Sequence, residues 1–313
     1  MVKKAEAVSS PVLPAAGTKM VDEIRSHDII HLYKKIMNVD VNRFFNGHST
    51  IEVRECNSTG FRFYYPFNTA GDSRFYESMH LTGDYYRPWS YDHQLAYDTV
   101  KNNEQVLEIG CGSGMLLEKL KEKTHRLTGL EFHQTAVDEC RKKGLDAFNE
   151  SIEQHAAKRP AFYDVVCIMQ VLEHVTAVHS FLSAAVRVLK PGGKLIIGVP
   201  NCEPWFRRFD KYEILNMPPH HMGLWNEKVF RSIQHIFSIR LNKVLITGEA
   251  RILVDAYLRA KYWLDIKTLI HHHSAIEKIK MAALGAVTVP LSIAKKLNGG
   301  IPGGYIGVVF SKN

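Results

Sequence analysis

The sequence has few cysteines and no long apolar run. Its five cysteines are scattered along 313 residues, and none forms a Cys-x-x-Cys pair. This spacing argues against a disulfide framework and against a structural zinc site, so the sequence predicts no metal site. No window of 18 residues is apolar throughout, and residues 281–294, the longest apolar stretch, are too few to span a bilayer. We therefore expect a cytoplasmic protein.

Acidic residues are scarce in the last fifth of the chain. The formal net charge is +8, and from Arg251 onward nine Lys and Arg face only three Asp and Glu. Two interpretations stay open, a solvated basic helical face and a patch for anionic lipid or an acidic partner. Lysines also flank the apolar run 281–294 on both sides. A helical insert over 250–297 could therefore pack as a cap or contact a membrane peripherally.

The first hundred residues lack the regular pattern of the rest. Residues 1–20 are rich in Ala, Pro and Ser and have no apolar core segment, so we expect a disordered lead-in without a secretory signal. Residues 21–100 form a second region. The apolar spacing predicts a helix over 21–38, and alternating apolar residues predict a hairpin over 50–65. Aromatic residues then crowd 75–97, and we expect this region to cap a site.

Residues 101–313 read as one α/β domain. Short apolar runs alternate with helical patterns, which is typical of a doubly wound, mostly parallel sheet. We expect seven strands, at 106–109, 126–131, 147–151, 163–169, 194–200, 239–248 and 305–312. We expect helices at 115–123, 134–143 and 175–189. This is a Rossmann-like architecture, with the helical insert 250–297 before its last strand.

A glycine-rich loop directly after the first strand of this domain is the strongest chemical signal. The loop contains Gly110, Cys111, Gly112 and Gly114, with Glu108 two positions ahead. The third glycine comes one place too early for a dinucleotide fingerprint. A GxGxG loop preceded by an acid is instead the pattern of S-adenosylmethionine (SAM)-dependent methyltransferases. SAM has an ammonium and a sulfonium, and Glu108 would supply the complementary charge.

Further cofactor contacts are expected at the ends of two other strands. Glu131 follows the second strand about 20 residues after the loop, where an acid can accept hydrogen bonds from ribose hydroxyls. Phe132 could pack on an adenine or in the core. Met169 and Gln170 end the strand at the switch point of the sheet, where ligands collect, so we expect them at the methionine end of the cofactor.

Three histidines are candidates for a catalytic base or an acceptor contact. His174 follows the switch-point strand, and His220 and His221 follow the next strand of the sheet. A structural histidine at a helix start and ordinary loop histidines are the alternatives. The run 271–273 of three histidines reads as a solvated stretch. The chain lacks an Asn/Asp-Pro-Pro-Tyr segment, which argues against a nucleic-acid amino group as the acceptor.

Residues 104–201 resemble the class I methyltransferases, in particular the ubiquinone-biosynthesis O-methyltransferase group. The similar segments are 149–153, 163–166, 172–175 and the helix exit 189–193. The resemblance implies SAM contacts at Gly110, Glu131 and Met169. It also directs attention to Ser151 and Ile152, in the segment similar to that group's third strand, as cofactor contacts.

The flanks of this segment leave the acceptor open. They are more similar to methyltransferases of glycan and secondary-metabolite pathways, so aromatic, glycan-linked and lipid-linked small molecules are all considered. Trp205, Phe206 and Trp225 suit a planar acceptor or a simple core, and we expect the 201–225 loop to close over the site. The function expected is methyl transfer from SAM to a small molecule, at oxygen. A SAM-binding regulator without turnover and an RNA methyltransferase are the alternatives.

Overall fold

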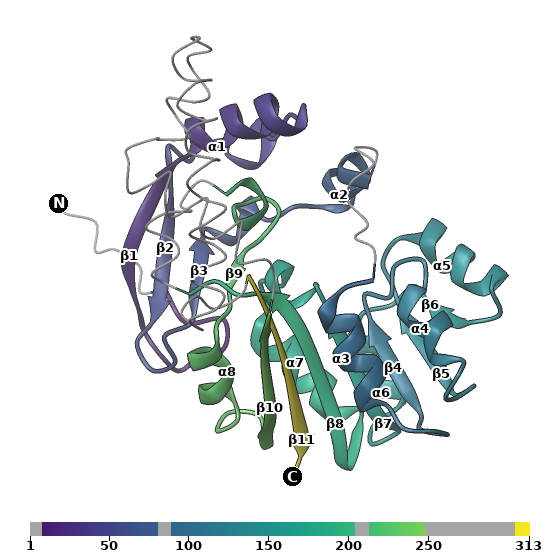
Figure 1. The fold of residues 1–313 in the computed structure, drawn as a ribbon. Helices are drawn as coiled ribbons and strands as arrows, with labels where there is room; N and C mark the ends of the chain where they lie inside the picture. Colours follow the sequence, from purple (N-terminus) through teal and green to yellow (C-terminus); the bar gives the residue numbers. More distant parts are fainter. Residues whose placement is uncertain (1–7, 81–88, 204–212, 248–303) are drawn as a thin grey trace, which may run out of the picture.

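The computed structural model describes residues 8–80, 89–203, 213–247 and 304–313 (Figure 1). Several expectations fall outside these residues: Trp205, Phe206, the histidines 271–273, and the insert 250–297 with its membrane contact. Among the described residues, no helix combines the length and the apolar character needed to cross a bilayer.

A seven-stranded sheet forms the larger part of the molecule. Its order is β10-β11-β8-β7-β4-β5-β6. The strands are β4 (Val106–Ile109), β5 (Leu127–Leu130), β6 (Asp146–Phe148), β7 (Tyr163–Met169), β8 (Leu189–Pro200), β10 (Ile239–Thr247) and β11 (Tyr305–Lys312). The five strands from β6 to β8 pair in parallel, and β11 runs antiparallel to β8 and β10. The expected doubly wound, mostly parallel seven-stranded sheet is confirmed.

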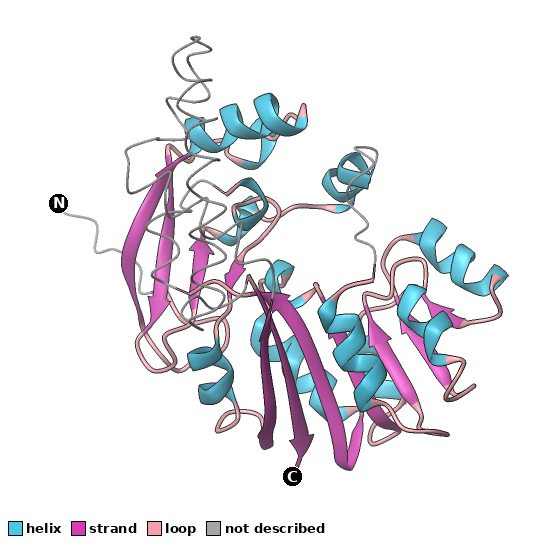
Figure 2. Ribbon diagram, in the orientation of Figure 1, coloured by secondary structure: helices cyan, strands magenta, loops and turns pink. Residues whose placement is uncertain are grey.

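Helices cover both faces of this sheet (Figure 2). On one face are α3 (Tyr91–Thr99), α4 (Met115–Leu120) and α5 (Gln134–Lys142), and on the other are α6 (Ile152–Lys158), α7 (Val178–Arg187) and α8 (Glu227–Ile233). Alternate residues of β7 face the two cores: Val165 joins one cluster and Val166 the other. A near-continuous apolar strand is what burial on both faces requires.

The sequence did not predict α6. We expected a strand over 147–151, but β6 ends at Phe148 and Ser151 is the N-cap of α6. The hydroxyl of Ser151 accepts from the Gln154 amide at 3.2 Å, and the Gln154 side chain accepts from the Ser151 amide, which together form a capping box.

A second, four-stranded sheet lies beside the first (Figure 1). It has the order β1-β2-β3-β9 and contains β1 (Thr18–Arg25), β2 (Thr50–Cys56), β3 (Arg62–Tyr65) and β9 (Gly223–Leu224). The expected hairpin over 50–65 is confirmed as β2 and β3. The first part of the expected helix over 21–38 is wrong, because residues through Arg25 pair with β2. The helix itself, α1 (Ser26–Leu32), starts later and is followed by a π-helical turn, Tyr33–Met37.

The lead-in is also more ordered than expected. Ser9 bridges to Gly17, and the side chain of Val12 is fully buried in the core that underlies the larger sheet. A disordered lead-in over 1–20 is therefore wrong for residues 8–20. Composition alone could not show that this stretch finds a partner surface.

Candidate functional site

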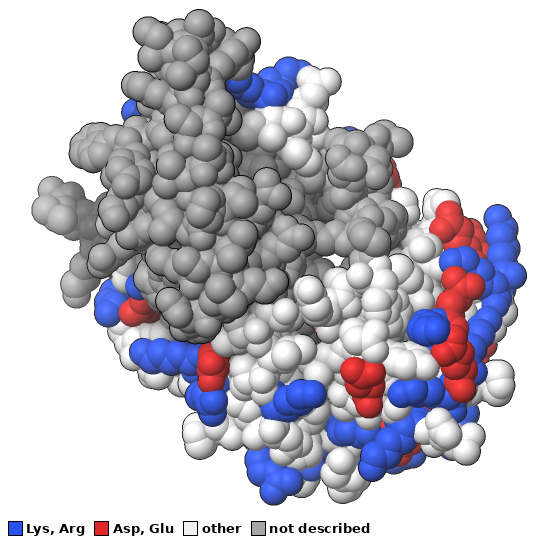
Figure 3. All heavy atoms as spheres, viewed as in Figure 1, with Lys and Arg blue, Asp and Glu red and all other residues white. Residues whose placement is uncertain are grey.

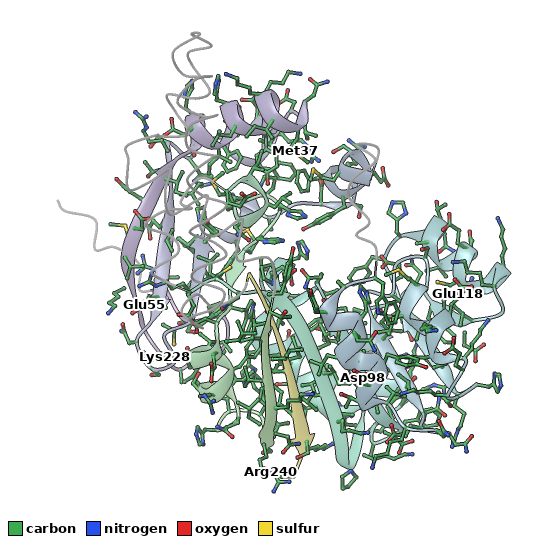
Figure 4. The ribbon with its side chains drawn as sticks, in the orientation of Figure 1. Met37, Glu55, Asp98, Glu118, Lys228 and Arg240 are labelled. Carbon is green, nitrogen blue, oxygen red and sulfur yellow. The ribbon has the colours of Figure 1, made fainter. Side chains whose placement is uncertain are left out.

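A large cavity opens at the carboxyl ends of β4 and β7, the neighbouring strands at which the chain reverses its direction across the sheet. Ligands collect at such a switch point in open α/β sheets. The cavity has a volume of about 1580 Å³. One part of its wall comes from the glycine loop, and another comes from α2 (Ser73–His80) and the chain around it. Met37, labelled in Figure 4, belongs to this second part.

The glycine loop is held tightly against its neighbours. The amides of Gly110 and Cys111 both donate to the carbonyl of Leu130 in β5. Gly110 has φ +74°, and a Cβ there would lie 2.3 Å from a methyl carbon of Val171. A side chain at this position would therefore be strained in its backbone and would clash as well. Glycine at this position therefore lets the loop take this conformation against Val171.

Glu108 has a buried carboxyl group in the wall of the cavity. Its side chain is 3% exposed, and its Oε2 has no hydrogen-bond partner among the described residues. Burial, followed by the nearby Glu131 and Asp92, raises the pKa of Glu108 well above its usual range. A buried, unpaired carboxyl group beside two other acids is unfavourable by itself. A cationic ligand would remove that cost, and the ammonium of SAM fits this requirement.

Glu131 connects the end of β5 to the glycine loop. Its Oε2 accepts from the Gly112 amide at 3.0 Å, and its Oε1 accepts from the His133 amide at 2.9 Å. A carboxylate has about four acceptor sites, so both oxygens keep capacity for ribose hydroxyls. The next residue, Phe132, is 72% exposed at the cavity wall. The core alternative for Phe132 is therefore wrong, and its ring is accessible to a planar ligand.

The candidate histidines lie together although 46 residues separate His174 from His220. Their ring centroids are 4.8 Å apart, and His221 lies 4.8 Å from His174 and 4.3 Å from His220. His174 ends the short 3-10 helix Leu172–His174 that follows β7. All three side chains line the cavity. The structure thus brings together two motifs that the sequence could only name separately.

Burial weakens His174 as a base. It lowers the pKa of His174 to about 4, although hydrogen bonds with the His220 and Gln170 backbone oppose the shift. A general base is most effective when its pKa lies near the working pH. At neutral pH, His174 is uncharged and accepts a proton only weakly.

Comparison with known proteins gives matches to methyltransferases. A family model described as a methyltransferase domain matches residues 107–197. The ubiquinone biosynthesis O-methyltransferase of Klebsiella pneumoniae is 36% identical over 104 residues, which cover 31% of this chain and 43% of that protein. The enzyme with the same name from Salmonella arizonae is 34% identical over 165 residues, 46% of this chain and 68% of that protein.

The chain belongs to the SAM-dependent methyltransferases. It spans about half the length of most of the curated relatives it matches, for example 43% and 51% of two of them. Among solved structures, a SAM-dependent methyltransferase from Archaeoglobus fulgidus is 16% identical with a TM-score of 0.47, and the match covers 70% of this chain and 94% of that one.

Most of the predicted cofactor residues of this methyltransferase line the cavity. Those that do so are Glu108, Gly110, Cys111, Gly112, Glu131, Phe132, Ile152, Met169 and Gln170. Two are not among the lining residues: Gly114 closes the loop against Leu145 with φ +85°, and Ser151 caps α6. A cofactor contact for these two stays a prediction.

Sequence reasoning missed Asp92. This residue is 5% exposed near the start of α3, and its Oδ2 accepts from the Gln170 side chain at 2.9 Å. A Cβ on Gly198 in β8 would lie 2.4 Å from the Cβ of Asp92, so the glycine lets α3 approach the sheet. Asp92 lies within an aromatic stretch, where the sequence gave no reason to single out an acid.

Trp225 was offered as an acceptor contact or a core residue. It is fully buried and is not among the residues that line the cavity. Its ring packs 4.5 Å from Phe61 of the hairpin and 5.2 Å from Phe230 of α8. The acceptor alternative is therefore wrong, and Trp225 is part of the core between the two sheets.

Proposed function

We propose that this methyltransferase transfers the methyl group of SAM to an oxygen atom of a small-molecule acceptor. The observation that supports the proposal is one cavity whose wall includes both the glycine loop and the α2 segment. Its acidic residues suit a cationic cofactor, and a volume of about 1580 Å³ leaves room for an acceptor beside it. The ubiquinone biosynthesis O-methyltransferases among its relatives favour oxygen as the acceptor atom.

On the cofactor side, each residue has one expected task. Glu108 would bind the ammonium, and Glu131 would accept hydrogen bonds from the ribose hydroxyls while holding the Gly112 amide. Gln170 would lie along the methionine end, fixed by its bond to Asp92. SAM supplies a methyl group on a sulfonium, which is already a good leaving group. The protein therefore mainly positions the acceptor oxygen in line with that methyl group.

On the acceptor side, the wall combines apolar and polar groups. Met37, Met79 and Leu215 contribute apolar surface, and Tyr76 contributes a ring and a hydroxyl. Tyr76 donates to the His220 carbonyl at 3.1 Å, which ties α2 to the segment that carries the histidines. This lining supports an acceptor with a planar or apolar body and a polar group directed toward the histidines. An aromatic or lipid-linked compound meets that description.

The described residues on the face shown in Figure 3 give no support for a nucleic-acid acceptor. On the face shown in Figure 3, acidic and basic side chains are intermixed rather than gathered into a stripe of one sign. Proteins that bind a phosphate backbone use a continuous basic stripe or patch.

The expected peripheral membrane contact through 250–297 stays a prediction, and sedimentation with anionic liposomes at low and high salt would check it.

The test is incubation of the purified protein with SAM and a panel of acceptors. The panel contains phenols, catechols, sugars and lipid-linked forms, and the release of S-adenosylhomocysteine and the mass of the product are measured. We expect a product heavier by one methylene with the methyl group on oxygen. Binding of SAM without turnover on any acceptor would favour the regulator alternative, and a product methylated at nitrogen or carbon would contradict the proposed atom.

A further inference from the structure

Asp92 lies in the cavity wall, and both of its carboxylate oxygens accept hydrogen bonds. It is the second residue of α3 and is buried. Its Oδ1 accepts from the Ser90 hydroxyl and, at 3.1 Å, from the His93 amide. Its Oδ2 accepts from the side-chain amide of Gln170 at 2.9 Å. One oxygen therefore secures the start of the helix, and the other contacts the residue that follows β7.

Gly198 of β8 makes the contact between Asp92 and Gln170 possible. A Cβ at this glycine would lie 2.4 Å from the Cβ of Asp92 and 2.7 Å from its Oδ2, so a larger residue would displace the acid. The backbone amide of Gln170 donates to the carbonyl of the same glycine at 2.8 Å. Gly198 thus holds the backbone of Gln170 and leaves the space from which Asp92 holds its side chain.

Gln170 has a backbone conformation that is uncommon for a residue with a side chain. Its φ is +54°, in the left-handed region, which is unfavourable for any residue with a Cβ. Such conformations persist where the surroundings fix them, and they gather at functional sites. Here the surroundings are Gly198 and Asp92, and Gln170 lines the cavity at the switch point of the sheet. The contact with Asp92 is therefore part of what fixes this residue beside a ligand.

The bond to Asp92 also decides which end of the Gln170 amide is left for a ligand. An ionised carboxylate only accepts hydrogen bonds, so the NH₂ group of Gln170 must face Asp92. The amide oxygen is attached to the same carbon atom and is directed away from the acid. Among the described residues, none donates a hydrogen bond to this oxygen. It therefore remains as an acceptor for a donor group on a cavity ligand, and a cationic donor suits it best.

We infer that Asp92 is a positioning residue for the methyl donor: by holding the NH₂ group of Gln170, it turns the Gln170 oxygen toward the ammonium of SAM. The inference rests on the proposed contact between Gln170 and the methionine end of the cofactor. Asp92 lies close enough to Glu108 to contribute to the raised pKa of that acid, so both acids belong to the same part of the wall. Their tasks differ, because Glu108 would bind the ammonium directly and Asp92 acts through Gln170.

The experiment measures SAM binding to variants of the full-length protein by calorimetry. Asp92→Asn keeps the size of the side chain, and its oxygen can still accept from Ser90 and His93. Its new NH₂ group would face the NH₂ group of Gln170, so the Gln170 amide must turn and present its donors to the cavity. We expect SAM to bind at least about tenfold more weakly, because a cation then meets a donor instead of an acceptor. Circular dichroism checks that the variant is folded.

Two changes at Gln170 separate positioning from a direct or structural role. Gln170→Glu in the Asp92→Asn background reverses the polarity of the pair, since the new carboxylate accepts from the new amide and keeps an oxygen for the ammonium. This double variant should return to within about threefold of the native affinity. Gln170→Met removes the amide and should weaken SAM binding by itself. Adding Asp92→Asn to Gln170→Met should cause no further loss, because the group through which Asp92 acts is already missing.

The same helix offers a matched control. Asp98 of α3, labelled in Figure 4, accepts from the side-chain amide of Gln94 at 2.8 Å, and neither residue is among the described residues that line the cavity. Asp98→Asn should therefore bind SAM as the native protein does.

Three results would overturn the inference. Asp92→Asn could bind SAM with native affinity, or it could lose as much affinity in the Gln170→Met background as alone, which would mean that Asp92 acts on the ligand directly. The third result is that Gln170→Glu fails to restore binding to Asp92→Asn. Binding is measured without an acceptor, so these results do not depend on whether the methyl group is transferred to oxygen.

Discussion

Glu108 lowers the stability of the protein without ligand, and we expect it to strengthen the binding of a cationic ligand. Its carboxyl group is buried beside two other acids, and its pKa lies well above the usual range because of burial. In the unfolded chain the same group ionises near its ordinary pKa. Folding at neutral pH must therefore take up a proton or bury a charge, and either one costs free energy. A cationic ligand reverses this, because it favours the ionised form.

This opposition predicts the behaviour of Glu108→Gln. Because the pKa of Glu108 is raised in the folded state, the unfolded chain loses this proton at a lower pH than the folded protein does. The free energy of unfolding of the native protein therefore falls as the pH rises from about 5 toward 8. Gln cannot ionise, so the variant should be more stable than the native protein at pH 8, and the difference should shrink at pH 5. Urea unfolding without ligand at both pH values measures it. Equal unfolding free energies at pH 8 would contradict a costly carboxyl group.

The same variant should bind SAM less well. A hydrogen bond to a charged group contributes about 1.5–3 kcal/mol, so we expect roughly a tenfold to hundredfold loss in calorimetry. The native affinity should rise with pH as Glu108 ionises, and the affinity of the variant should be flat. Glu118→Gln, at an exposed acid of α4 also labelled in Figure 4, is the control and should show neither change.

Glu131 supports a second prediction at this scale. Glu131→Ala removes the proposed ribose acceptor and the partner of the Gly112 and His133 amides. We expect SAM binding to weaken by about 1–3 kcal/mol, since one charged acceptor is lost and the loop is less fixed. Asp138→Ala, at a half-exposed acid of α5 that is not among the cavity-lining residues, should bind as the native protein does. An unchanged dissociation constant for Glu131→Ala would refute the ribose role.

At the scale of elements, β9 joins the two sheets. It pairs with β3, and Trp225 follows it directly and packs between Phe61 and Phe230. Truncation of a buried Trp to Ala typically costs about 3–5 kcal/mol, and we expect that loss for Trp225→Ala in urea unfolding. SAM affinity of the folded protein should change little, because Trp225 is not among the cavity-lining residues.

The matched control for this prediction is Trp89→Ala. That side chain is 36% exposed, so its removal should cost about 1 kcal/mol or less. If both tryptophans prove equally costly, Trp225 does not join the sheets. A large loss of SAM affinity in Trp225→Ala would mean that the junction also shapes the cofactor wall.

Elements with local signals were predictable from the sequence. The strand Val106–Ile109 is a buried run, apolar except for Glu108, that leads into a glycine loop, and this combination indicates both the strand and the turn. Two of the elements that were missed, β1 and β9, depend on distant partners. β1 exists because it pairs with β2, and β9 has two residues whose only signal is their partner in β3. Periodicity within one segment contains no information about such pairing.

The candidate site likewise contains residues that the sequence could reveal and residues that it could not. The acids and glycines of the cofactor wall follow the ends of strands, so their spacing revealed them. The grouping of His174 with His220 depends on how the 213–222 segment returns to the sheet, and Asp92 depends on α3 lying over Gly198. These are contacts between elements that the sequence predicted separately or not at all.

At the scale of the whole molecule, the two sheets share one core. Val12, Phe61 and Phe63 from the N-terminal part belong to the same buried cluster as Leu107 of β4 and Val166 of β7. Figure 1 shows the two sheets side by side, with the chain passing between them more than once. A shared core means that neither sheet can lose its packing without exposing apolar surface of the other. We therefore expect the described part to unfold as one unit.

Hydrogen exchange with and without bound cofactor can measure whether the two sheets unfold as one cooperative unit. S-adenosylhomocysteine at 100 times its dissociation constant should stabilise the native state by about 2.7 kcal/mol. In a single cooperative unit, the slowest amides exchange only through global unfolding. The slowest amides of β2 (Thr50–Cys56) should therefore gain the same protection as those of β7 (Tyr163–Met169), although no residue of β2 lines the cavity. In Glu131→Ala both gains should fall together at the same ligand concentration. Protection that rises in β7 and stays constant in β2 would instead mean that the N-terminal sheet opens independently, and that the shared core does not couple it to the cofactor site.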